Sequence, residues 1–105
     1  MSGTTHPDFA LARRVLAGDE TAFRTLFDGS YARLYRFALT RVGGDAAVAE
    51  DVVQQTFCRA IEHLDRYRGE AALYTWFCQI CRNTVVDYWR ARGRDAATFV
   101  SLEDR

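Results

Sequence analysis

Four polar residues in the C-terminal half recur about one helical turn apart, namely Gln79, Arg82, Asn83 and Arg90. Guanidinium groups neutralise phosphates, and amide groups hydrogen-bond to base edges or to the nucleic-acid backbone. A turn rich in arginine and aromatic residues, 66–72, precedes them. This set of side chains indicates a nucleic-acid-binding surface, and ordinary solvated arginines are the alternative interpretation.

Residue types that would support catalysis are not arranged for it. The sequence contains no glycine-rich phosphate loop, nucleophile elbow or HExxH motif. We therefore predict no enzymatic activity and no cofactor. Cys78 and Cys81, one turn apart, could with Cys58 and His63 form a zinc or redox site. A structural zinc site needs four ligands and usually a turn between paired cysteines, so we expect core thiols and no metal.

The bulk composition limits the class of protein. The chain has 105 residues, 49% of them apolar, which suffices for one domain with one core. All fourteen basic residues are arginine, and they balance fourteen acidic residues. Because non-specific DNA affinity comes from phosphate neutralisation, a neutral chain needs a larger partner to hold DNA. Three cysteines indicate reduced thiols in a cytosol, and no apolar run is long enough to insert into a membrane.

Hydrophobic periodicity and turn residues predict an all-α fold, a compact bundle of about four helices. We predict N-caps at Asp8, Asp19 and Asp45. The first helix covers 9–17, the second runs to about residue 41, the third ends before a turn at 65–71, and the fourth ends near residue 92. The glycine at position 29 is either tolerated within the second helix or bends it. Residues 1–7 are expected to form a short mobile arm.

Two helical faces remain for partners. On the third helix, Asp51, Gln54 and Gln55 cluster off the buried stripe and form a polar, acidic face. On the fourth helix, Phe77 belongs to the apolar stripe. Trp76 lies on the same stripe, where an aromatic residue is usually part of the core. Tyr74 lies off the stripe and is predicted to be an exposed stacking residue.

Several motifs in a fixed order resemble one family. They are AEDVVQQTF at 49–57, DRYRGE at 65–70, YTWF at 74–77, ICRN at 80–83 and DY at 87–88, preceded by AGDETAF at 17–23 and LFD at 26–28. Together they resemble region 2 of the extracytoplasmic-function (ECF) sigma factors of bacterial RNA polymerase, over residues 8–94. The resemblance implies a helical domain that docks on the clamp helices of the polymerase beta-prime subunit. It also implies binding and melting of the minus-ten promoter element, with capture of the non-template single strand.

The resemblance assigns roles to residues of this chain. Asp51, Gln54 and Gln55 match the polymerase-docking motif, and the 66–72 turn matches a loop that holds a flipped base. The DNA-binding candidates are Arg66, Arg68, Gly69, Tyr74, Trp76, Gln79, Arg82, Asn83 and Arg90. For Trp76 the resemblance leaves two roles, a core residue or a wedge beside the melted duplex. Ala72 stands where a helix-capping serine is common, which predicts a looser start of the fourth helix.

The resemblance also predicts the setting of the domain. Residues 1–94 would form the region 2 domain, and 95–105 would begin a linker to a region 4 domain that is absent from this sequence. An anti-sigma factor is the expected second partner, in a bacterial cytoplasm. Two alternatives remain, a sigma-like interaction module that binds only an anti-sigma protein, and a cysteine-based metal or redox sensor.

Overall fold

The computed structural model describes residues 5–92, so predictions for 1–4 and for the linker at 95–105 lie outside the described residues. The elements are α1 (Asp8–Leu16), α2 (Glu20–Arg41), α3 (Ala46–Glu62), one 3₁₀ turn η1 (Leu64–Arg66) and α4 (Leu73–Arg90). The part that the structure describes contains no strand. The predicted all-α bundle is confirmed.

Side-chain caps start two of the helices as predicted. The Asp19 carboxylate accepts a hydrogen bond from the backbone N–H of Ala22 at 3.0 Å, and Asp45 accepts one from Val48 at 3.2 Å. Each bond satisfies a donor that the first turn of a helix leaves free. Helix α2 continues through Gly29, so the glycine is tolerated without interrupting the helix.

The predicted cap of the first helix is wrong. Pro7 occupies the N-cap position of α1 and makes no side-chain cap bond, while Asp8 is the first helical residue. The Asp8 carboxylate instead accepts a hydrogen bond at 2.9 Å from the backbone N–H of Leu73, the first residue of α4. Asp8 therefore caps a different helix, 65 positions along the chain.

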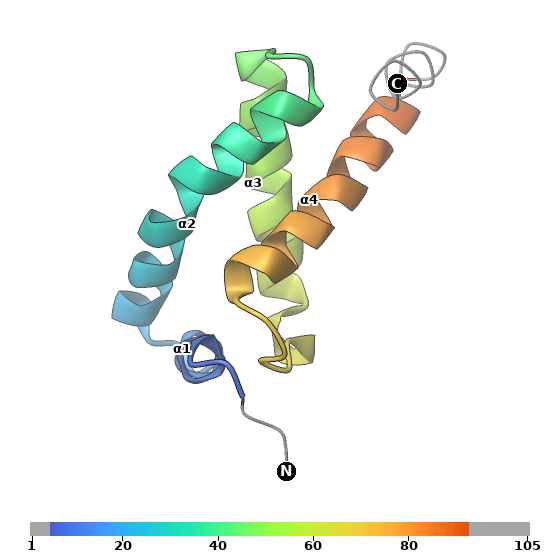
Figure 1. Ribbon diagram of the computed structural model, residues 1–105. Coiled ribbons are helices and arrows are strands. Elements are labelled where there is room, and N and C mark those ends of the chain that lie inside the picture. Colours follow the sequence, from blue (N-terminus) through green and yellow to red (C-terminus); the bar gives the residue numbers. More distant parts are fainter. Residues whose placement is uncertain (1–4, 93–105) are drawn as a thin grey trace.

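The core lies where α2, α3 and α4 pack on one another, and Figure 1 shows α3 passing behind the other two. Leu34, Val52 and Phe77 from the three helices are fully buried. The hydroxyls of the two buried threonines, Thr56 and Thr84, donate hydrogen bonds to backbone carbonyls of their own helices, at 2.7 and 2.8 Å. This satisfies polar groups that would otherwise cost free energy inside the core.

Helix α1 packs on α2 and on η1, at the end of the bundle where α4 begins (Figure 1). The predicted mobile arm comprises residues 1–7, and two of its described residues, Thr5 and His6, lie against Gly69 of the 66–72 loop. The backbone N–H of His6 donates to the Gly69 carbonyl at 2.7 Å. Helix α1, Thr5 and His6 thus pack against the loop that leads into α4. No helix in the described range is long and apolar enough to cross a membrane.

Candidate nucleic-acid interface

The 66–72 loop is held in shape by an aromatic residue. Tyr67 is buried, and its hydroxyl donates a hydrogen bond to the Ala71 carbonyl, which closes the loop on itself. Its ring lies between Phe9 of α1, 6.4 Å away, and Trp76 of α4, 5.6 Å away, measured between ring centroids. Burial raises the pKa of the Tyr67 hydroxyl, which keeps it a donor.

A small cleft of about 160 Å³ opens between this loop and the first turns of α4. Its lining residues are Arg66, Tyr67, Arg68, Glu70, Ala71, Thr75, Trp76 and Gln79. It brings together four of the predicted DNA-binding residues, which supply two guanidinium groups, an indole ring and an amide. An engineered protein cavity of about 150 Å³ binds benzene, so a flat ring fits a space of this size. Trp76 is half-buried, which leaves both of its predicted roles open.

Gly69 is in the loop but does not line this cleft. Its φ of +76° is one that L side chains rarely adopt. A Cβ added there would lie 2.9 Å from the Phe9 Cβ and closer still to the Thr5 side chain. The space beside Gly69 is therefore occupied by Thr5 and Phe9 of the chain's own N-terminal segment, and it is not open to a ligand.

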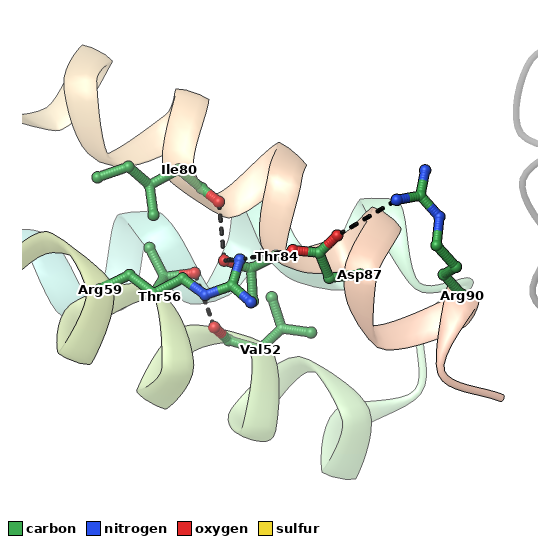
Figure 2. Close-up of polar contacts among 7 residues, drawn as sticks. All are labelled: Val52, Thr56, Arg59, Ile80, Thr84, Asp87 and Arg90. Atoms are coloured by element: carbon green, nitrogen blue, oxygen red, sulfur yellow. Dashed lines mark hydrogen bonds and ion pairs between the residues drawn. The ribbon is translucent and has the colours of Figure 1, made fainter.

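A second cleft of about 580 Å³ lies between α3 and α4 and contains two more predicted residues, Asn83 and Arg90. Figure 2 shows the polar contacts that two of its lining residues, Arg59 and Asp87, make with each other and with their neighbours. Arg59 donates to the Thr84 hydroxyl at 3.3 Å and to the Asp87 carboxylate at 3.0 Å. The other Asp87 oxygen lies 3.8 Å from Arg90. Asp87 thus neutralises part of the positive charge beside Asn83.

Two of the predicted DNA-binding residues, Tyr74 and Arg82, lie on the side of α4 that faces α2 rather than at either cleft. Tyr74 is half-buried, with the Arg33 guanidinium 3.9 Å from its ring centroid, so the prediction of an exposed stacking residue is wrong. Arg82 is exposed and lies 5.4 Å from the centroid of the Phe37 ring. The structure therefore divides the predicted residues between two sides of one helix.

The predicted polymerase face is exposed on α3 at Asp51, Gln54 and Gln55. Beside it, α2 and α3 border an open apolar groove of about 900 Å³. The groove is lined by Phe23, Phe27, Tyr31, Gln54, Phe57, Cys58, Ile61 and Glu62. Phe23 remains 42% exposed, so the apolar stripe of α2 is only partly covered and joins a polar face of α3.

The three cysteines are all free thiols, and no disulfide joins them. Cys78 and Cys81 are buried as expected, whereas Cys58 is exposed, which corrects the prediction of a core thiol there. Burial raises the pKa of the Cys81 thiol, which favours the unreactive protonated form. In the described range, no three His, Cys, Asp or Glu side chains are grouped to hold a metal ion.

Sequence reasoning missed the residues whose partners come from another helix. Asp8, Arg59 and Arg33 each contact α4 from elsewhere in the chain. The residues of these pairs are 65, 28 and 41 positions apart, and no local pattern indicated the partner of Asp8 or of Arg59. For Arg33 one sequence signal was available. Arg33, Phe37 and Arg41 are spaced by four residues, so they lie close together on one side of α2 and form a basic, aromatic surface there.

The sequence is similar to one family of known proteins. The sequence model of the sigma-70 region 2 family matches residues 26–95. The chain is 39% identical over 87 residues to the ECF RNA polymerase sigma-E factor of Haemophilus influenzae, and 37% identical over 91 residues to the RNA polymerase sigma-H factor of Pseudomonas aeruginosa. It is 38% identical over 88 residues to the ECF RNA polymerase sigma-E factor of Escherichia coli K12.

These matches cover 83%, 87% and 83% of this chain but 45%, 47% and 44% of the three relatives. The chain therefore spans a little under half the length of the curated relatives it matches. No solved structure matches it significantly. The resemblance predicted from the ordered motifs is confirmed, and the chain belongs to the sigma-70 region 2 family.

Proposed function

We propose that this chain is the promoter-recognition domain of an alternative sigma factor of the ECF group, acting in the bacterial cytoplasm by binding rather than by catalysis. In this role it docks on core RNA polymerase and binds and melts the minus-ten promoter element. The observation that carries the proposal is the small cleft beside the 66–72 loop, where Arg66, Arg68, Trp76 and Gln79 converge.

The cleft suits a base that has left the duplex. Flipped and single-stranded bases are held by stacking and by hydrogen bonds in pockets, while arginines neutralise the flanking phosphates. Gln79 lies at the cleft, and Asn83 follows it one turn later on the exposed face of α4. The non-template strand can therefore run from the cleft along α4 toward Arg90.

The α3 face is proposed as the docking site for the beta-prime clamp helices. Asp51, Gln54 and Gln55 are exposed and supply a carboxylate and two amides. The apolar groove beside Gln54 adds a surface into which a partner helix can bury apolar side chains. We propose that an anti-sigma factor competes for this same face and so keeps the protein from the polymerase.

Polymerase docking is tested by pull-down of core enzyme with the full-length protein. We expect Asp51→Arg with Gln54→Ala to abolish capture, because charge reversal opposes a basic partner and the amide hydrogen bonds are lost. Asp28→Arg, an exposed charge reversal on α2, is the matched control and should leave capture intact. Unchanged capture by the double variant would remove this face from the proposal.

A second test uses Cys58, which is exposed at the groove. A bulky maleimide on this thiol should block capture of core enzyme by filling the groove. The same treatment of Cys58→Ser should have no effect, since the two remaining thiols are buried.

DNA binding is tested separately, with holoenzyme and a single-stranded minus-ten oligonucleotide. Asn83→Ala should weaken binding by about 1–3 kcal/mol if its amide contacts a base edge. Thr25→Ala, at an exposed site on α2, is the control. A different result is that the protein captures polymerase while neither Asn83→Ala nor substitutions at the cleft change oligonucleotide binding. That result would favour a module that binds proteins only.

A further inference from the structure

Three arginines that lie apart from the cleft share one feature, which is that an aromatic ring holds each guanidinium group. We call Arg33, Arg41 and Arg82, with the rings of Tyr74 and Phe37, the arginine seam. Arg33 lies 3.9 Å from the Tyr74 ring centroid. Arg41 and Arg82 lie 4.9 and 5.4 Å from the centroid of the same ring, that of Phe37. The seam follows the contact between α2 and α4.

The rings order these side chains without consuming their hydrogen-bond donors. A guanidinium group that stacks on a ring with its face keeps the in-plane N–H groups free for an oxygen acceptor. The Tyr74 hydroxyl also makes a long 3.4 Å hydrogen bond to the backbone carbonyl of Arg33, which ties the two helices together at this point. Preorganised arginines lose less entropy when they bind a ligand.

The seam also lacks counter-charges. Within residues 5–92, no carboxylate forms an ion pair with Arg33, Arg41 or Arg82. By contrast, Arg14, Arg59 and Arg90 each have an aspartate partner. Two guanidinium groups on one ring repel each other, and an anionic ligand would relieve this repulsion.

The spacing fits a polymer of phosphates. Arg33 and Arg41 are eight residues apart on one helix, which corresponds to about 12 Å along the helix axis. That distance is about three to four base-pair steps of B-DNA, in which each strand carries one charge per 3.4 Å. We propose that the arginine seam is a second nucleic-acid contact that binds phosphodiester groups of the promoter, on the flank of α4 opposite Asn83.

This inference rests on the proposed function, because polymerase must first bring the domain to DNA. The test compares the Arg33→Gln, Arg41→Gln double variant with wild type, each as the full-length protein assembled with core enzyme. We expect the slope of log affinity against log salt to become less negative by about 1.8 on a duplex probe, or about 1.4 on a single-stranded one. Which probe responds identifies the source of the phosphates.

Two control variants separate charge from packing. The Arg33→Lys, Arg41→Lys variant keeps the charges but loses the planar groups, and its salt slope should stay close to wild type. Arg24→Gln makes the same charge change at an exposed site on α2, nine residues before Arg33, and should leave the slope unchanged. A loss of thermal stability equal in the Gln and Lys variants, with wild-type salt slopes, would show a packing role and overturn the inference.

Two further outcomes are informative. Reduced capture of core enzyme by the Gln variant, with normal salt slopes, would overturn the inference in favour of a contact with an acidic protein surface. Failure of the wild-type protein to bind core enzyme would refute the proposed function. The seam would then be measured with the protein alone on a random-sequence duplex, where an unchanged slope would refute it too.

Discussion

The Asp8 carboxylate of α1 lies 2.9 Å from the backbone nitrogen of Leu73 and accepts its hydrogen bond, so the first helix caps the last one. Ala72, at the N-cap position of α4, has no side-chain oxygen and makes no cap bond. The predicted looseness at the start of α4 is thus offset by a residue from another helix. The same contact fixes the helix end that borders the proposed base-binding cleft.

Removing this cap should be measurable in thermal unfolding. We expect Asp8→Ala to destabilise the fold by about 1 kcal/mol, as for other lost caps, or about 4–8 °C in Tm. Asp8→Asn keeps an acceptor oxygen and should cost less. Asp28→Ala, at an exposed carboxylate on α2, is the control. Equal melting temperatures for wild type and Asp8→Ala would show that the bond contributes nothing.

A serine at position 72 should replace the missing carboxylate. The backbone of Ala72 is extended, with φ −60° and ψ 149°, as an N-cap requires. A serine hydroxyl there can accept from the N–H of Tyr74 or Thr75. We therefore expect Ala72→Ser to restore most of the stability that Asp8→Ala loses, as judged from the double variant. An additive loss in the double variant would contradict this account.

Gly69 and Gly44 provide a matched pair of substitutions. Both have positive φ, +76° and +82°, so alanine is strained at either site by about 1–2 kcal/mol. At Gly44 nothing lies within 4 Å of an added Cβ, whereas at Gly69 it meets Thr5 and Phe9. Gly69→Ala should therefore lower Tm more than Gly44→Ala and should alone weaken minus-ten binding. Equal losses of stability would mean that residues 5–9 do not hold the loop.

Acid should remove the contribution of the α2 cap. The hydrogen bond from the Ala22 N–H, assisted by one from Arg14, lowers the pKa of Asp19 below its ordinary 3.8. A group whose pKa is lowered by folding stabilises the fold above its unfolded pKa and loses that effect as pH falls through the folded one. Asp19→Ala should thus lower Tm at about pH 7 and have little effect at about pH 2. The same deficit at both values would contradict the assignment.

Asp87 is predicted to restrain DNA binding at the α3–α4 cleft, because it lies between Arg59 and Arg90. Asp87→Asn should free Arg90 for a phosphate and make the single-strand salt slope more negative by up to about 0.7. The loss of stability should not exceed about 1 kcal/mol, since the ion pairs are half-exposed. Asp28→Asn is the control, and a weaker affinity for Asp87→Asn would show that this carboxylate supports binding.

Local chemistry made much of this molecule predictable. Helical periodicity and the carboxylate caps at Asp19 and Asp45 depend on residues within one or two turns, so the all-α bundle and most helix limits followed from the sequence. The ordered motifs likewise identified the family and the loop at 66–72. Exposure of Asp51 and Gln54 followed from the same periodicity.

Contacts between distant residues were decided only by tertiary structure. Asp8 could be assigned to α1 or to α4 only once the two helices met, because either offers free N–H groups. A glycine at position 69 lets the backbone approach a ligand closely, but in the folded chain Thr5 and Phe9 fill the space beside it. Tyr74 and Arg82 lay outside the apolar stripe in sequence, yet α2 covers that flank of α4 with Arg33 and Phe37. A helical pattern determines which side of a helix a residue lies on, and only the neighbouring helix determines what that side contacts.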